Sequence, residues 1–171
     1  KLDGGAMFGN APKAMWERWI PADEHNRISL SCRCLLVIDN GKKILFETGI
    51  GAFFSPKYRE RFGVIEKEHM LLKNLAAIGF SHEEIDIVVL SHLHFDHAGG
   101  LLSQYKEDDE HTLLFPNASF IASQEAWARA LNPHSRDRAS FIPQLQILLE
   151  SSGRLKLQNT TQSSLLGNDY T

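Results

Sequence analysis

The residues best suited to chemistry in this chain lie in one short segment, His92-Leu93-His94-Phe95-Asp96-His97. The segment holds three imidazoles and one carboxylate within six residues. If the chain stays extended through Leu93, the side chains of His92 and His94 project to the same side and could share one metal ion. A turn at Asp96 and His97 would place a second pair of donors beside them. Imidazole and carboxylate ligands suit Zn²⁺, and they also suit Fe or Mn.

A buried strand is expected to deliver this segment. The run from Ile85 to Leu90 is apolar and rich in β-branched residues, which indicates a strand inside a sheet. Polar clusters directly after such a strand are typical of functional sites in α/β folds. We therefore interpret the cluster as a metal site. The other histidines do not lie in such a cluster of potential ligands and are interpreted as solvent-exposed or helix-capping residues. They are His25, His69, His82, His111 and His134.

Local signals predict the elements around this strand. Asn40-Gly41 between two β-rich runs predicts a type I′ hairpin, because both central residues of that turn need a positive φ. Helical spacing predicts a helix over 66–78 that ends at Gly79. Ser81 and Glu84 match a capping box. Further expected elements are strands near 119–122 and 155–157, a helix over 123–131, and a partly helical stretch over 136–150. This order predicts one α/β domain that spans 1–171.

Composition excludes several classes of protein. Of the 171 residues, 43% are hydrophobic and 23% are charged, which is enough for a core and excludes a disordered or collagen-like chain. No apolar run approaches the roughly 20 residues of a transmembrane helix. The net charge of −3 and the lack of a basic block argue against a nucleic-acid partner. Cys32 and Cys34 are poorly spaced for a disulfide on an extended strand, which favours a reduced, cytoplasmic protein.

The segment 92–97 resembles the His-x-His-x-Asp-His signature of the metallo-β-lactamase fold superfamily. The stretch 44–51 is similar to the strand and Asp-Thr-Gly loop of that superfamily, and the chain as a whole resembles its lactonase-like branch of metallo-hydrolases. This resemblance implies an α/β fold built as a four-layer αββα sandwich, with the metals at one edge of its two sheets.

The same resemblance implies roles for the four side chains. His92 and His94 would bind the first metal, while Asp96 and His97 would bind the second. Two zinc ions are implied for the complete site, with Fe or Mn as alternatives. The implied reaction is attack by a metal-bound hydroxide on a small ester, lactone or related acyl substrate, and Asp96 would also orient the water or shuttle its proton.

The chain departs from the family pattern in two places. Glu47 stands where the family usually has Asp, and this longer carboxylate would shift the support of the site from behind. After His97 the family pattern continues with further ligands, whereas His111 and His134 lack the expected context. We therefore expect this chain to hold the N-terminal portion of the fold, with the remaining ligands beyond Thr171. The remainder of its own chain, or a homo-oligomer partner, would then cover the sheet.

Three other functions stay open at this point. One is a mononuclear non-haem iron oxidoreductase of the persulfide-dioxygenase type on the same fold, which metal analysis would separate from a hydrolase. A second is a nuclease, which the acidic charge balance disfavours. The third is a member that keeps the fold without turnover.

Overall fold

The computed structural model describes residues 1–159 and residue 166. It divides the chain into two compact units. The first consists of Lys1–Ser31 with Phe54–Lys67, and the second of Cys32–Phe53 with Glu68–Thr171. The expectation of a single domain over 1–171 stays a prediction. All four candidate metal ligands belong to the second unit.

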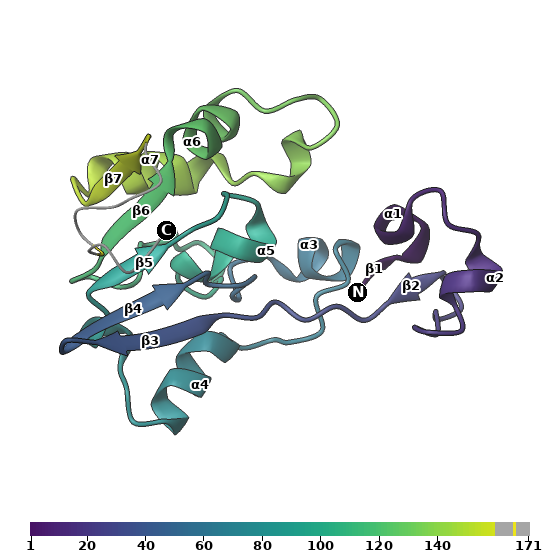
Figure 1. The fold of residues 1–171 in the computed structure, drawn as a ribbon, viewed down its shortest axis with the longest axis horizontal. Coiled ribbons are helices and arrows are strands. Elements are labelled where there is room, and N and C mark those ends of the chain that lie inside the picture. The colour runs from purple at the N-terminus through teal and green to yellow at the C-terminus, as the bar shows by residue number, and fades with distance from the viewer. Residues whose placement is uncertain (160–165, 167–171) are drawn as a thin grey trace. The chain divides into compact units, whose positions relative to one another are not determined.

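A mixed sheet of five strands forms the second unit, in the order β3-β4-β5-β6-β7 (Figure 1). Its strands are β3 (Leu35–Asp39), β4 (Lys42–Phe46), β5 (Ile87–Val89), β6 (Ser119–Ser123) and β7 (Leu155–Gln158). β3 and β4 are antiparallel, whereas β4, β5, β6 and β7 are parallel to one another. The carboxyl ends of four strands therefore share one edge, which is where α/β sheets place their ligands. The predicted α/β class is confirmed.

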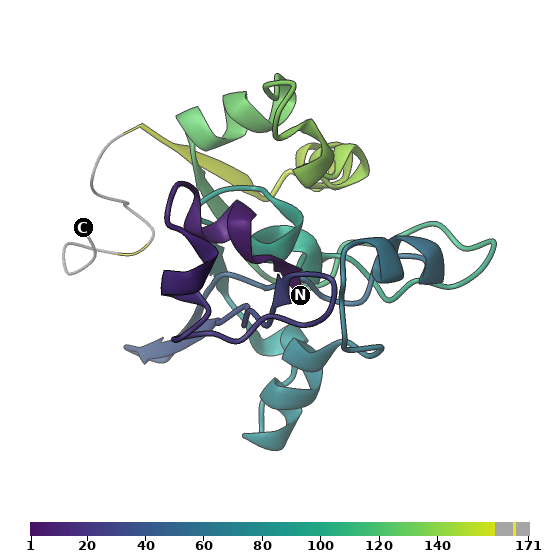
Figure 2. The ribbon, with the colours of Figure 1, turned by 90° about the vertical axis from the view of Figure 1, so that its right-hand side faces the viewer.

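Helices lie toward both ends of this sheet. Near β3 and β4 lies α4 (Met70–Ala77), and near β6 and β7 lie α6 (Gln124–Leu131) and α7 (Pro143–Ser151) (Figures 1 and 2). The remaining helical elements of the unit are α5 (Phe95–Ala98) and the 3₁₀ turns η1 (His82–Glu84), η2 (Gly99–Leu101) and η3 (Arg138–Ser140). None of the described helices is long and apolar enough to cross a bilayer.

The local signals explain where these elements begin and end. Asn40 and Gly41 have φ values of 48° and 80° and join β3 to β4, which confirms the predicted hairpin. Gly79, at φ 87°, follows the end of α4. Ser81 and Glu84 form the predicted capping box. The Ser81 hydroxyl oxygen accepts the backbone N–H of Glu83, and a carboxylate oxygen of Glu84 accepts the backbone N–H of Ser81. Each of these patterns involves only a few neighbouring residues, so it can be recognised in the sequence without knowledge of the fold.

Both faces of the sheet contribute to the core. Leu45, Val88 and Phe120 are neighbours across three strands and are almost completely buried. The opposite face carries another buried cluster made of Ile44, Ile87 and Ile121. Burial on both faces explains why β5 is a continuous apolar run rather than an alternating one.

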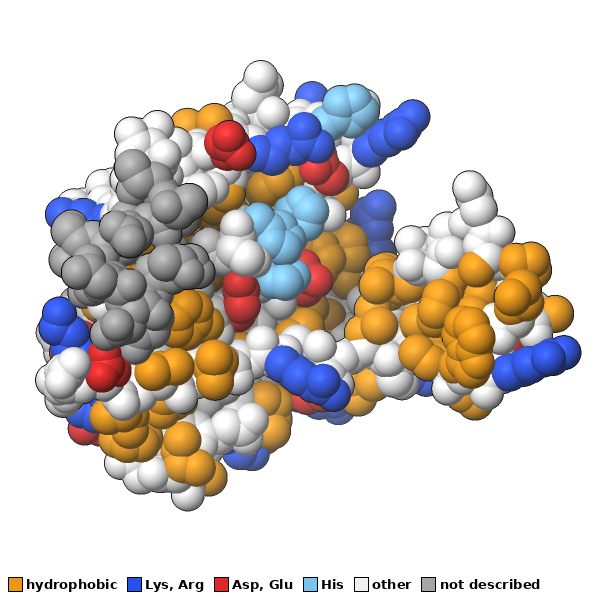
Figure 3. Space-filling model, viewed as in Figure 1, with side chains coloured by type: hydrophobic (Ala, Val, Ile, Leu, Met, Phe, Trp, Pro, Cys, Tyr) orange, Lys and Arg blue, Asp and Glu red, His pale blue; other side chains and the backbone are white. Residues whose placement is uncertain are grey.

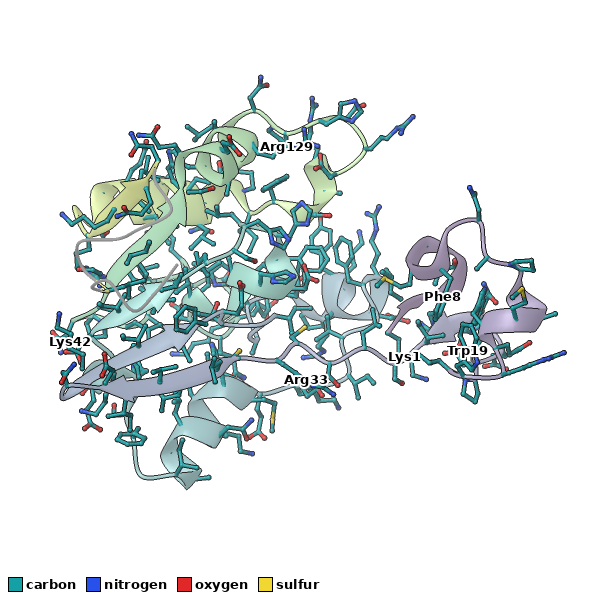
Figure 4. The ribbon with its side chains drawn as sticks, viewed as in Figure 1. Lys1, Phe8, Trp19, Arg33, Lys42 and Arg129 are labelled. Carbon is teal, nitrogen blue, oxygen red and sulfur yellow. The ribbon has the colours of Figure 1, made fainter. Side chains whose placement is uncertain are left out.

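The first unit is small and has its own aromatic core. Its strands β1 (Leu2–Asp3) and β2 (Arg27–Ile28) are antiparallel. Trp16 is 1% exposed and stacks on Phe8, with ring centroids 5.2 Å apart. Trp19 of the same unit is 70% exposed; Figure 4 labels Phe8 and Trp19. Its helices are α1 (Gly4–Phe8), α2 (Lys13–Trp16) and α3 (Pro56–Arg61).

The two cysteines lie outside the strands, in the segment between β2 and β3. Cys32 is exposed and Cys34 is partly buried. Burial raises the pKa of the Cys34 thiol to about 11, so this thiol is a poor nucleophile at neutral pH.

Candidate metal centre

The ends of β4 and β5 bring the candidate residues together. The backbone N–H of Glu47 donates to Val89 O at 2.9 Å, and the N–H of Leu90 donates to Ile121 O at 2.9 Å. Glu47 therefore leaves β4 beside the point where the chain leaves β5 toward His92. Histidine and acidic side chains gather on the face of this unit shown in Figure 3.

The three imidazoles of the motif form a compact group. The ring centroid of His92 lies 4.0 Å from that of His97 and 4.6 Å from that of His94. Ser91 Oγ lies 3.0 Å from His92 Nδ1, within hydrogen-bond distance. Burial, together with the two neighbouring imidazoles, lowers the pKa of His92. A neutral imidazole is the form that binds a metal ion.

Glu47 supports His97 from behind. Its Oε2 lies 3.0 Å from His97 Nδ1, while its Oε1 accepts a hydrogen bond of 2.8 Å from the backbone N–H of Ser91. Both carboxylate oxygens are thus used, one on each of the two segments of the site. Glu47 has a φ of 64°, a conformation that side-chain-bearing residues seldom adopt. The longer carboxylate predicted to shift this support reaches both partners.

The loop after Glu47 is packed tightly against the motif. Thr48 is 1% exposed, and its backbone N–H and its Oγ1 both donate to His97 O at 2.9 Å. The N–H of Gly100 donates to Gly49 O at 2.9 Å. A Cβ on Gly100 would collide with the backbone carbonyl of Thr48, so only glycine allows this approach. The close packing fixes α5, and with it the directions of His97 and Asp96.

Asp96 is more exposed than His94 and His97. It lies in the first turn of α5, and its side chain is 46% exposed. Its Oδ2 is 3.6 Å from His97 Nε2. A carboxylate that is open to solvent and next to an imidazole can bind a metal ion or accept a proton.

The donor types fit a zinc centre. His92, His94 and His97 are neighbouring imidazoles, and Asp96 adds a carboxylate beside them. Within the described part of the chain, however, no group of three or more His, Cys, Asp or Glu side chains is arranged so that it could hold a metal ion. The predicted residues are therefore brought together as a partial set, and their role as ligands stays a prediction.

His69 fulfils the capping alternative predicted for the other histidines. It is 5% exposed, its Nδ1 accepts the N–H of Leu72 at the start of α4, and its Nε2 lies 2.9 Å from Gly100 O. Its capping role was predicted, but its contact with the motif segment was not. His25 and His134 are exposed, in agreement with the sequence analysis.

Two residues near the centre were missed by the sequence analysis. Asp137 Oδ2 lies 3.8 Å from His94 Nε2, and Arg129 donates to that same oxygen through Nε and Nη2 at 3.1 and 2.7 Å. The Arg129 guanidinium holds the pKa of Asp137 below its usual range. Asp137 lies more than forty residues after His94, in a segment without a recognisable motif, so no local signal pointed to it.

Comparison with protein families identifies one match. Residues 28–153 match the model of the metallo-beta-lactamase superfamily. This range contains every candidate ligand and strands β3 to β6 of the five-stranded sheet, and it ends before β7.

Solved structures with the same fold span roughly twice the length of this chain. A probable metal-dependent hydrolase from Staphylococcus aureus is 31% identical, with a TM-score of 0.83 over 96% of this chain and 57% of that one. AidC, a dizinc quorum-quenching lactonase in complex with a product, is 30% identical, with a TM-score of 0.55 over 76% of this chain and 44% of that one. A hydrolase of the beta lactamase superfamily, AbOPH, shares the fold at 21% identity and a TM-score of 0.62, over 88% of this chain and 51% of that one.

Proposed function

The chain belongs to the metallo-beta-lactamase superfamily, and from this premise we propose that it carries the first ligands of a binuclear zinc hydrolase for small esters, lactones or related acyl compounds. The similarity to a probable metal-dependent hydrolase and to a dizinc lactonase supports this choice. The chain spans about half the length of these structures, so the activity is proposed for the whole protein.

One observation carries the proposal: three imidazoles and a carboxylate meet beyond the carboxyl ends of the parallel strands of the sheet. The contact of His92 with both His94 and His97 brings together residues that the motif spreads over six positions. Burial, together with the two neighbouring imidazoles, lowers the pKa of His92 and favours its neutral form, which is the form that binds a metal ion. A shared metal ion would turn the same proximity into binding free energy.

The residues of the centre would divide the work as follows. Bound zinc would supply a Lewis acid for the acyl carbonyl and an activated water at neutral pH. His92 and His94 would hold one ion, and Asp96 and His97 the other. Glu47 would accept the Nδ1–H of His97, which leaves Nε2 of that ring as the donor nitrogen. Asp96, open to solvent, would take the proton released by the water at one of its carboxylate oxygens.

Metal content tests this proposal directly. We expect the whole protein to retain close to two zinc ions after exhaustive dialysis, and the His92→Ala/His94→Ala double variant to lose at least one. The exposed His25 of the first unit provides the control His25→Ala, which should keep the metal content of the wild type.

The metal itself separates the competing functions. Zinc with lactone or ester hydrolysis would support the hydrolase. A single iron ion with oxygen consumption would favour the oxidoreductase, and a wild-type protein without metal would refute the metal centre altogether.

A further inference from the structure

The segment between α6 and α7 is attached to the candidate centre through His94. The backbones of His94 and Phe141 form an isolated antiparallel bridge. Their rings also meet edge to face, with centroids 4.6 Å apart and planes at 75°. Phe141 is only 7% exposed, so its ring is packed from several sides. The segment is therefore held in place against one particular imidazole of the motif.

A carboxylate of this segment faces the same imidazole. Asp137 Oδ2 lies 3.8 Å from His94 Nε2, and the two side chains are 23% and 28% exposed. The distance is beyond a hydrogen bond, but it places the negative charge opposite one specific ring nitrogen. The nitrogen on the other side of the ring, Nδ1, is the one that does not face the carboxylate.

Arg129 of α6 fixes the carboxylate in this position. It donates two hydrogen bonds to Asp137 Oδ2 through Nε and Nη2. The other oxygen, Oδ1, is buried, and no described residue donates a hydrogen bond to it. The oxygen that Arg129 holds, Oδ2, is the same oxygen that faces Nε2 of His94.

Glu47 shows what such a carboxylate does elsewhere in the centre. It lies 3.0 Å from His97 Nδ1 and directs the other nitrogen of that ring outward. Asp137 stands in the corresponding position for His94, on the opposite nitrogen and from a distant part of the chain. Carboxylates behind metal-binding imidazoles fix the tautomer and the ring orientation.

We propose that Asp137, held by Arg129, is a positioning residue for His94: its negative charge faces Nε2 of that imidazole and favours the proton on Nε2, which leaves Nδ1 as the nitrogen that donates to the metal. This inference rests on the proposed metal centre. It also means that Arg129 of α6 acts on the candidate metal centre indirectly, by holding Asp137 next to His94. A neutral imidazole has one N–H, so a carboxylate at Nε2 settles which nitrogen has the free lone pair.

Zinc affinity, measured on the whole protein by competition with a chromophoric chelator, tests the inference. The variants are Asp137→Asn, which keeps the shape and removes the charge, and Arg129→Gln, which removes the anchor. We expect zinc affinity to fall about 10- to 100-fold in Asp137→Asn and by less in Arg129→Gln. The matched control is Asp109→Asn, since Asp109 forms a similar ion pair with Lys106 but is 64% exposed. It should bind zinc like the wild type.

A spectroscopic readout separates positioning from a merely structural role. In the zinc-loaded wild type, ¹⁵N chemical shifts of His94 should show the proton on Nε2 and the bonded lone pair on Nδ1. A proton on Nδ1 would overturn the inference, and so would an Asp137→Asn variant with wild-type zinc affinity. If the wild type binds no zinc, the proposed function itself fails. If the wild type binds zinc and Asp137→Asn binds it with the same affinity, the proposed function stands and this inference fails.

Discussion

Two carboxylates lie next to His97, and their surroundings give them different tasks. The side chain of Glu47 is 20% exposed and is committed to His97 and to the backbone of Ser91. That of Asp96 is 46% exposed and lies 3.6 Å from the other nitrogen of the ring. A carboxylate tied by hydrogen bonds stabilises its neighbours, whereas one open to solvent can exchange protons. Asp96 is therefore the residue at which catalysis and folding can be separated.

Replacing Asp96 should affect the reaction much more than the fold. We expect Asp96→Ala to lower kcat for ester or lactone hydrolysis by about 10²- to 10⁴-fold, the usual range for a general acid or base. The thermal unfolding of the metal-free protein should change little, because the side chain is largely outside the core. Steady-state kinetics and a melting curve on the whole protein measure both quantities.

The control for this change is Asp109→Ala, which removes the same charge from an exposed position. A kcat for Asp96→Ala equal to that of this control would show that Asp96 takes no part in the reaction. An equal loss of stability and activity in Asp96→Ala would instead indicate a structural residue.

At the scale of elements, the sequence predicts what neighbouring residues decide among themselves. The Asn40-Gly41 turn and the capping box that Ser81 begins each depend on a few adjacent residues. The strand before the motif also follows from its unbroken apolar run. The order of these elements along the chain could therefore be predicted from the sequence.

Contacts between residues far apart in the sequence could not be predicted in the same way. His69 lies within hydrogen-bond distance of Gly100, 31 positions along the chain, and Arg129 is linked to His94 through Asp137. A single imidazole or carboxylate in a polar segment has the same appearance whether it is exposed or buried. Its partner is chosen by the packing of helices on the sheet, which no local pattern encodes. For the same reason the motif predicted the histidine group, but not the carboxylate behind His94.

His69 makes the contact between α4 and the motif segment sensitive to pH. Its pKa is lowered chiefly by burial, so the folded protein favours the neutral ring, while the unfolded chain protonates near pH 6.5. The unfolded state then binds more protons below this pH, and stability must fall as the pH falls from about 6.5 toward the lowered pKa. Above about pH 6.5 the stabilising contribution is complete.

Urea unfolding of the metal-free protein between pH 7.5 and 5 can measure this effect. We expect His69→Asn, which keeps a capping side chain but does not titrate, to show a shallower loss of stability than the wild type. His25→Asn changes an exposed histidine and should keep the wild-type slope. Equal slopes for wild type and His69→Asn would mean that the buried imidazole does not control this stability.

At the scale of the whole molecule, the candidate ligands are too few for a finished centre. The four residues supply two ligands for each metal, whereas a catalytic zinc ion normally has three protein ligands and a water. His111 and His134 do not supply the difference in the described chain. His111 packs against the rings of Phe53 and Tyr105, and the Nδ1 of His134 accepts the N–H of Arg136.

We therefore expect residues 1–171 alone to bind zinc weakly and to hydrolyse little. The comparison is with a protein from the same gene that has the length of the solved relatives, of which this chain covers 57% and 44%. Zinc affinity by chelator competition and thermal unfolding with and without zinc are the two measurements. The longer protein should bind zinc tightly and gain melting temperature from it, because a ligand that binds only the folded state stabilises that state. The 171-residue chain should gain little. If it binds zinc as tightly as the longer protein and melts cooperatively as a monomer, the missing ligands lie within residues 1–171, and the division of His92, His94, Asp96 and His97 between two metals must be revised.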